Sequence, residues 1–378
     1  LNSQAIEKNK LIGADSTLQN INISSLDFDS RELSWKFKKN ELIRINGQDI
    51  EETYALYQQY WKNKFNQLRN NEEELNRLFI EIYGLRDELE PAVPLEEITI
   101  IREETNIVKD QLVFNANEVL AQFMSYSVGC MFGRYSLDKE GLILANQGET
   151  VQDYLNKIDK PANECPFMPD EDNIIPVLDD EWFEDDITNR FNQFLKVSFG
   201  EKNFNKNLAF VEEQLGKDIR KYFTKDFYPD HIKRYKKRPI YWMFSSPKGS
   251  FNVLIYMHRY TQNTVSNILN KYLKEFIGKL KTRKETLQHI QVNGSASEKT
   301  KAIKENDSID KMLIELHEYE RDVLFPLATE RIAIDLDDGV LVNYNKFGKA
   351  VKEVTGLNDK ATKNKVKEFD WIDATQIR

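Results

Sequence analysis

Two runs of apolar residues at heptad-like spacing constrain the fold of this chain more than any other feature. The first run lies between Thr261 and Ile290, with apolar positions Leu269, Leu273, Phe276, Leu280, Leu287 and Ile290. The second extends from Ile303 to Leu324, after a short polar segment that contains Asn293-Gly294-Ser295. Helices with such seams bury them against each other. The two runs therefore predict a long antiparallel helical hairpin.

The other patterns predict a mainly α protein, that is, an α+β fold with small β elements and helical domains. Aromatic residues at spacings of three and four predict a long helix between Asp49, as its N-cap, and Gly84, as its C-cap. Further helices are expected over about 106–132 and 186–199. Apolar runs predict β-like segments at 98–101 and around the Pro247-Lys248-Gly249 turn, over 240–257. Asp338-Gly339 predicts a β turn within 332–344.

Changes in composition divide the 378 residues into five expected regions. Residues 1–30 are polar and are expected to form a linker or a frayed segment. Residues 31–158 are expected to form a helical subdomain, and 159–260 an acidic loop region followed by a basic, aromatic subdomain. Residues 261–325 form the predicted hairpin. Residues 326–378 hold the β-turn element and a Lys-rich tail.

Composition and missing motifs exclude several classes of protein. The chain has no run of about 18 apolar residues, so we expect no membrane partner. Two cysteines, Cys130 and Cys165, favour a reducing, cytoplasmic compartment. G-x-G, G-K-[ST] and Pro-Pro are absent, which leaves no glycine-rich cofactor loop, no P-loop and no base-clamping methyltransferase motif. We therefore predict no catalytic residue, metal site or cofactor in this chain, which begins at Leu1 and is expected to be part of a longer protein.

The net charge is −9, but positive charge is concentrated in one segment. Residues 217–248 hold ten Lys and Arg against three Asp, and they follow an acidic segment, 159–187, with eleven Asp and Glu. Lys and Arg neutralise phosphates, and aromatic rings stack on bases or support the binding groove. The predicted DNA-binding residues are Lys225, His231, Lys233, Arg234, Lys236, Lys237, Arg238, Lys248 and Arg259, with Tyr235, Tyr241 and Trp242 as stacking or supporting rings. Alternatively, the basic residues neutralise the acidic segment.

Several segments occur in a distinctive order along the chain. They include Glu32-Leu33-Ser34-Trp35-Lys36-Phe37, Ser127-Val128-Gly129-Cys130-Met131-Phe132-Gly133-Arg134-Tyr135-Ser136, Lys236-Lys237-Arg238-Pro239-Ile240-Tyr241-Trp242 and Asp335-Leu336-Asp337-Asp338-Gly339. This order resembles large adenine-specific DNA methyltransferases of BREX phage-defence systems, the PglX family, over about residues 30–348. Lys36 stands where the family usually has an acid.

The resemblance implies that this chain is the non-catalytic C-terminal, DNA-engaging and spacer region of a site-specific adenine DNA methyltransferase, from a restriction-modification or BREX system. S-adenosylmethionine is then expected to bind an upstream methyltransferase domain, and whether this chain itself is an enzyme stays open. Expected partners are double-stranded DNA, the upstream domain and other defence-system subunits. The alternative is a protein-interaction module that docks other subunits without touching DNA. The salt dependence of duplex binding separates the two.

Overall fold

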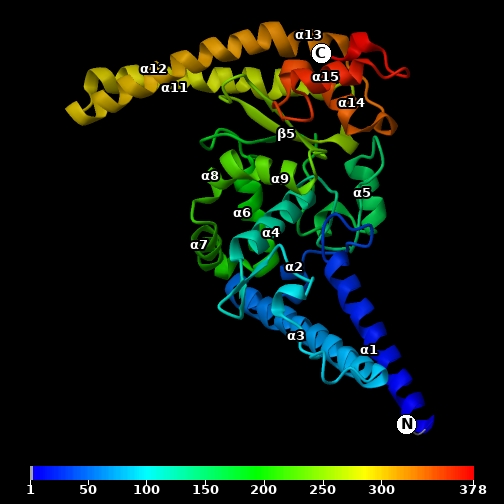
Figure 1. Cartoon of the computed structure of the whole chain (residues 1–378). Helices are drawn as coiled ribbons and strands as arrows, with labels where there is room; N and C mark the ends of the chain where they lie inside the picture. Colours follow the sequence, from blue (N-terminus) through cyan, green and yellow to red (C-terminus); the bar gives the residue numbers. More distant parts are fainter. Residues whose placement is uncertain (1–2) are drawn as a thin grey trace. The chain divides into compact units, whose positions relative to one another are not determined.

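The computed structural model describes residues 3–378, with side chains from residue 15 onward (Figure 1). It divides into two compact units, of which unit 1 comprises Leu1–Tyr126 and Leu195–Gly216. Unit 2 comprises Ser127–Phe194 and Lys217–Arg378. Helices predominate in both, and the strands form two small antiparallel sheets. The prediction of a mainly α fold with small β elements is therefore confirmed.

Unit 1 is built around a long helix, α3, at Ile50–Tyr83. Its bounds follow the sequence closely, because the Asp49 carboxylate accepts a hydrogen bond from the backbone N–H of Glu52 at 2.9 Å, and Gly84 ends the helix with a φ of 70°. The first half of the predicted stripe, Tyr54, Tyr57, Trp61, Phe65 and Leu68, is buried. In its second half Phe79 and Ile82 are exposed, so the expected core face ends before the C-terminus of the helix. The other elements of unit 1 are α1 (Ser3–Asp29), α2 (Glu41–Ile45), β1 (Thr105–Val108), β2 (Gln111–Phe114), α7 (Phe204–Leu215) and the start of α4 (Ala116–Met131).

Three expectations for unit 1 are wrong. Residues 3–29 form helix α1 instead of a linker, because the helix packs on α3: Ile23 is buried, and the Asn71 amide donates a hydrogen bond to Oδ1 of Asn20 at 2.9 Å. The second long helix starts at Ala116 rather than near residue 106. A β hairpin precedes it, whose turn residues Lys109 and Asp110 both have left-handed backbone angles. Residues 98–101 form no strand.

Unit 2 contains a three-stranded antiparallel sheet with the order β3 (Ile175–Pro176), β5 (Asn252–Tyr256), β4 (Tyr241–Ser245). The strands predicted over 240–257 are thus confirmed, and almost all of their side chains are buried. Around the sheet lie α5 (Val151–Ile158), α6 (Ile187–Phe199, shared with unit 1), α8 (Ile219–Lys221), a π-helical segment at Tyr222–Phe227 and α9 (Tyr228–Arg234). The helix expected over 186–199 is α6.

The predicted helical hairpin is confirmed and belongs to unit 2. Its first arm comprises α10 (Thr264–Asn267), a π-helical segment at Ile268–Leu273 and α11 (Lys274–Asn293). The second comprises α12 (Ala296–Tyr319), a π-helical segment at Glu320–Leu324 and α13 (Phe325–Glu330). In Figure 1, α11 and α12 run side by side. The turn is shorter than expected, because Ser295 caps α12 at once in a capping box with Glu298.

The C-terminal β element expected over 332–344 is wrong. Asp338-Gly339 opens helix α14 (Gly339–Asn345), after a 3-10 turn at Leu336–Asp338. The side chain of Asn343 explains the difference, because its amide donates to the carbonyls of Asp335 and Gly339 and holds the segment in a closed, helical form. The Lys-rich tail folds as well, into α15 (Lys360–Lys367). In the described part of the chain, no helix is both long and apolar enough to cross a membrane.

Candidate nucleic-acid interface

The basic residues Lys233, Arg234, Lys236, Lys237 and Arg238, here called the basic cluster, lie at the C-terminal end of α9. Tyr235 is the C-cap, and Lys236 and Lys237 have φ angles of 50° and 62°. The backbone N–H of Lys237 donates to the carbonyl of Ile232 at 2.8 Å, and that of Lys236 to Lys233 at 3.1 Å. This is a Schellman turn. It fixes the backbone of the cluster, and the helix dipole favours positive charge at this end.

Most of the basic cluster is exposed and lacks an acidic partner. Lys233, Lys236, Lys237 and Arg238 are exposed, as are Lys225 and Lys248 of the predicted set, while Arg234 is partly buried. Within residues 15–378, no carboxylate forms an ion pair with Lys233, Lys236 or Lys237. The Lys237 side chain lies against the backbone at Gly356, where an added Cβ would come within 3.2 Å of Nζ. Lys233, Lys236 and Lys237 therefore present uncompensated positive charge to solvent.

Two predicted DNA contacts, His231 and Arg259, lie in the interior and need correction. His231 is 2% exposed, and its Nε2 accepts hydrogen bonds from the backbone N–H groups of Ile240 and Tyr241, both at 3.2 Å. Burial, together with the positive charges of Arg234 and Arg134, holds the pKa of His231 well below its usual value. Arg259 donates to the carbonyls of Phe132, Asp170 and Glu171. Both side chains organise the backbone of unit 2 and do not reach its surface.

The three predicted aromatic rings are also buried, so they cannot stack on bases. Tyr241 and Trp242 have no exposed surface, and Tyr235 is nearly covered. The indole N–H of Trp242 donates to the carbonyl of Pro239 at 3.0 Å, just after the basic cluster. Their role is support of the turn. The sequence already indicated that Tyr241 and Trp242 are buried, because the unbroken apolar run 240–244 is typical of a strand buried on both faces.

The acidic segment, 159–187, makes its contacts elsewhere in unit 2. Asp186, with a side chain only 1% exposed, pairs with Arg220 at 2.7 Å. Asp172 pairs with Lys271 at 3.1 Å, and the hydroxyl of Tyr272 donates to Asp185 at 3.0 Å. Burial, reinforced by the charge of Asp172, raises the pKa of Asp170 to about 7. These contacts join the segment to α8 and to the base of the hairpin, not to the basic cluster.

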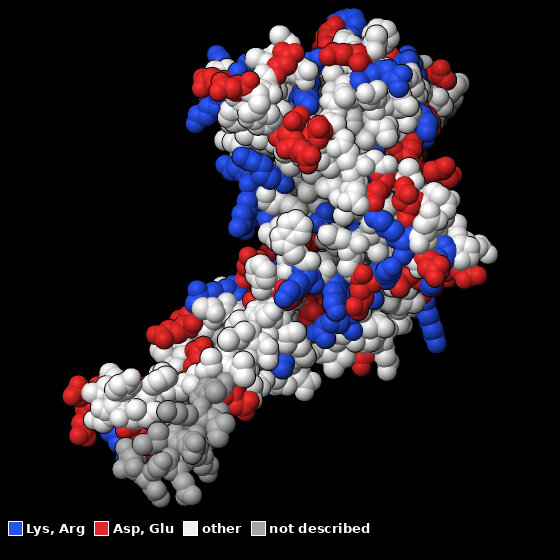
Figure 2. Space-filling model, turned by 90° about the vertical axis from the view of Figure 1, so that its right-hand side faces the viewer, with Lys and Arg blue, Asp and Glu red and all other residues white. Residues whose placement is uncertain are grey.

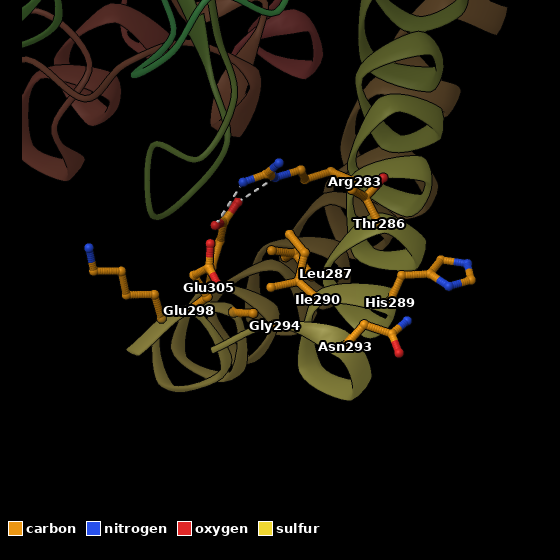
Figure 3. A pocket seen from close by; sticks show the side chains of 11 residues that line it. Arg283, Thr286, Leu287, His289, Ile290, Asn293, Gly294, Glu298 and Glu305 are labelled. Atoms are coloured by element: carbon orange, nitrogen blue, oxygen red, sulfur yellow. Dashed lines mark hydrogen bonds and ion pairs between the residues drawn. The ribbon is translucent and has the colours of Figure 1, made fainter. Parts of the chain in front are cut away.

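Sequence reasoning missed a cavity of about 540 Å³ near the tip of the hairpin (Figure 3). Leu287 and Ala302 supply buried apolar surface on its two helices. Arg283 reaches across it and donates to both carboxylate oxygens of Glu305, at 2.6 and 3.0 Å. His289 points away from that ion pair. Arg283 and Glu305 pair with each other, whereas Lys301, which also lines the cavity, forms no ion pair within residues 15–378.

The charged surface shows no face of a single sign in the view of Figure 2, where basic and acidic side chains are interspersed. Among the described residues, no group of three or more His, Cys, Asp or Glu could hold a metal ion. Cys130 is buried, and neither Cys130 nor Cys165 forms a disulfide. The exposed basic turn therefore remains the most distinctive polar feature of unit 2.

The chain is similar to part of adenine-specific methyltransferases, and the resemblance to the PglX family seen in the sequence is confirmed. It is 36% identical over 359 residues to the adenine-specific methyltransferase BrxX of Escherichia coli O9:H4 (strain HS), covering 90% of this chain and 29% of that protein. It is 37% identical over 354 residues to the adenine-specific methyltransferase PglX of Lacticaseibacillus casei (strain Zhang), covering 89% and 28%. The chain thus spans less than a third of each relative. No family model matches it.

Proposed function

We propose that this chain is a non-catalytic, C-terminal DNA-engaging region of an adenine-specific DNA methyltransferase in a BREX defence system, and that the basic cluster binds backbone phosphates. One observation carries the proposal: Lys233, Lys236 and Lys237 are exposed on a fixed turn, and no described carboxylate pairs with them. Like charges this close repel one another. An external polyanion removes that repulsion, and duplex DNA is the polyanion on which a methyltransferase works.

The basic cluster could be neutralised by DNA or by the acidic segment, 159–187. The contacts of that segment bear on the choice between the two. Asp172, Asp185 and Asp186 bond to Lys271, Tyr272 and Arg220. None of those contacts supplies Lys233, Lys236 or Lys237 with the internal counter-charge that the alternative requires. Contacts to phosphates position a protein on the duplex without reading its sequence. The cluster then acts as a grip, while base recognition and methyl transfer belong to other parts of the protein.

The relatives' names support the wider setting of the proposal. Both are adenine-specific methyltransferases more than three times as long as the matched region. We infer that S-adenosylmethionine binds an upstream methyltransferase domain, and that the region works in the cytoplasm with duplex DNA, that domain and other defence-system subunits. The hairpin would act as a spacer between them.

The test compares duplex binding by the wild-type chain and by Lys236→Glu with Lys237→Glu over a series of salt concentrations. Each lost phosphate contact lowers the slope of log affinity against log salt by about 0.9, so the double variant should lose up to about 1.8. Affinity should fall for duplexes of every sequence alike. The matched control is Lys304→Glu with Lys311→Glu, which changes the net charge equally at two exposed positions of α12.

Two outcomes would contradict the proposal. If the control weakens binding as much as the cluster variant, only the overall charge matters. If the cluster variant binds DNA like the wild type, the second candidate gains: a protein-interaction module. One observation favours that candidate, because α12 exposes two large apolar side chains, Ile303 at 50% and Ile314 at 63%.

A further inference from the structure

Arg134, three residues after the end of α4, carries a positive charge that no acidic side chain balances in the part of the chain whose side chains are described. Its Nε donates to the hydroxyl of Tyr135 at 3.0 Å, and one terminal nitrogen donates to the hydroxyl of Tyr256 at 3.2 Å. The guanidinium carbon lies 5.3 Å from the centre of the Tyr135 ring. The side chain is partly buried, and no carboxylate among residues 15–378 pairs with it. Removing a guanidinium from water without an anion is unfavourable.

A continuous series of aromatic rings forms the surroundings of Arg134. Ring centres are 4.6 Å apart for Tyr235 and His231, 4.8 Å for His231 and Tyr241, 5.6 Å for Tyr241 and Tyr256, and 4.7 Å for Tyr256 and His258. The series begins at the C-cap of α9, beside the basic cluster, and crosses β4 and β5. Arg134 is hydrogen-bonded to one of its members, Tyr256.

Gly129 leaves room for this arrangement. A Cβ at this position would lie 2.4 Å from Cδ2 of Tyr135 and 3.2 Å from the hydroxyl oxygen of Tyr241. The shorter distance is closer than carbon atoms approach without bonding. Any side chain at this position must therefore displace the Tyr135 ring on which the guanidinium rests. The surroundings of Arg134, here called the niche, are thus set by buried groups of the fold and not by surface side chains alone.

Both histidines of the series have a nitrogen that lacks a partner. Among the described residues, Nδ1 of His231 and Nδ1 of His258 have no hydrogen-bond partner. Because Nε2 of His231 accepts from two backbone N–H groups, the proton of the neutral ring is on Nδ1, which is a donor without an acceptor. His258 is partly exposed and its ring lies at a tilt of 31° against that of Tyr256, whose hydroxyl accepts a hydrogen bond from Arg134. A buried donor without an acceptor on His231, an unpartnered nitrogen on His258 and an unbalanced cation in the same group of side chains indicate a missing anion.

We propose that Arg134 and His258 form an anion site that takes one phosphate group, separate from the exposed basic cluster. Guanidinium groups bind phosphate through paired N–H donors, and Arg134 uses only two of its five for the tyrosines. The phosphate comes either from the backbone of a duplex or from a small phosphate compound. The proposal does not depend on DNA binding by the basic cluster.

The chain is well suited to a direct test because it has only four histidines. With selectively labelled histidine, NMR resolves each ring during a titration with inorganic phosphate. The expected result is a saturable shift of the His258 signals. Burial and the charge of Arg134 lower the pKa of His258 to about 4, against a smaller opposite effect of Glu149. A bound phosphate should therefore raise this pKa. His289 and His317, exposed on the hairpin, should not respond.

Variants of Arg134 show whether its guanidinium binds an anion or only supports the fold. Arg134→Gln should abolish the His258 response, whereas Arg134→Lys, which keeps the charge, should retain a weaker one. Lys236→Glu with Lys237→Glu is the matched control and should leave the response intact. Unchanged His289 and His317 signals in Arg134→Gln show that it is folded. If it does not fold, Arg134→Lys and the wild-type titration decide.

A parallel titration with a short duplex identifies the source of the phosphate. A shift of His258 with the duplex but not with inorganic phosphate assigns the site to DNA, and a shift with both assigns it to phosphate in general. If neither probe moves His258, or if Arg134→Gln responds like the wild type, the proposal is overturned. Failure of the control variant to bind DNA would bear on the basic cluster only, so the two proposals fail separately.

Discussion

The acidic segment, 159–187, and the basic cluster are both dense runs of like charge, but the fold uses them in opposite ways. Carboxylates of the acidic segment are committed to internal partners, as with Asp186 and Arg220 or Asp185 and Tyr272. Charges of the basic cluster, such as Lys236 and Lys237, are directed to solvent on a fixed turn. The two runs look like natural partners in the sequence, but within residues 15–378 no carboxylate of the acidic segment pairs with Lys233, Lys236 or Lys237. Charge density alone does not reveal whether a run stabilises the fold or serves a partner.

The largest effect should come from breaking the internal pairing of the acidic segment. Arg220→Met leaves Asp186 buried without its cation and also removes donors to the carbonyls of Leu178 and Asp180. The free energy of unfolding should fall by about 3–5 kcal/mol, as measured by denaturant unfolding. The matched variant Lys233→Met, in the basic cluster, should change it by no more than about 0.5 kcal/mol. Equal losses would remove the contrast between the two regions.

A smaller effect concerns pH. The pKa of Asp170 is raised to about 7 by burial and by Asp172, so the folded state holds a proton that the unfolded chain has lost above pH ~4. The contribution of Asp170 to stability is therefore present at low pH and is lost as pH rises toward 7. The free energy of unfolding of Asp170→Asn, taken relative to that of the wild type, should therefore increase by about 2 kcal/mol from pH 5 to pH 7. Thermal unfolding at both pH values measures this difference, and a difference independent of pH would refute the assignment.

Tyr272→Phe tests a single hydrogen-bonding group of the acidic segment. Its hydroxyl bonds to Asp172 at 3.1 Å and to Asp185 at 3.0 Å, and its removal leaves both carboxylates less well satisfied. We expect a loss of about 1 kcal/mol in the free energy of unfolding. Tyr83→Phe is a suitable control, because that ring is exposed near the end of α3. A loss no larger than in the control would mean that the segment does not depend on this contact.

The smallest effect is expected in the basic cluster. Lys236→Glu with Lys237→Glu should change the free energy of unfolding by no more than about 0.5 kcal/mol, since no described carboxylate pairs with either lysine. Differential scanning calorimetry at moderate salt is the measurement. A clear drop in the melting temperature would instead reveal an internal partner, and it would bring the basic cluster into the same category as the acidic segment.

The sequence predicted the elements whose signals are local. Asp49 and Gly84 bound α3 as cap residues, and the heptad seam gives the hairpin, because capping and periodicity act within a few residues along the chain. The errors arise where a distant or side-chain contact decides. Helix α1 depends on α3, and the amide of Asn343 closes a helix where Asp338-Gly339 predicted a β turn.

For the candidate site, residue type indicated the basic cluster but not which members face solvent. His231 and Arg259 look like their exposed neighbours in the sequence, and only the packing of β4 and β5 places them inside. The niche at Arg134 could not be predicted from spacing, because it joins residues from 129 to 258. Its one local signal was Gly129, which stands among apolar residues at the end of α4.

The Schellman turn at the end of α9 has a consequence for protein engineering. Its position after the C-cap, Lys236, has a φ of 50°, a conformation that glycine adopts freely and that costs other residues about 1–2 kcal/mol. Lys237 is in the same region of backbone space. A designer who sought only heat resistance would place glycine at 236. Lysine at both positions lowers the stability of the fold but places two positive charges on the exposed turn. Substitution by glycine would therefore stabilise the protein and weaken the phosphate binding that we propose.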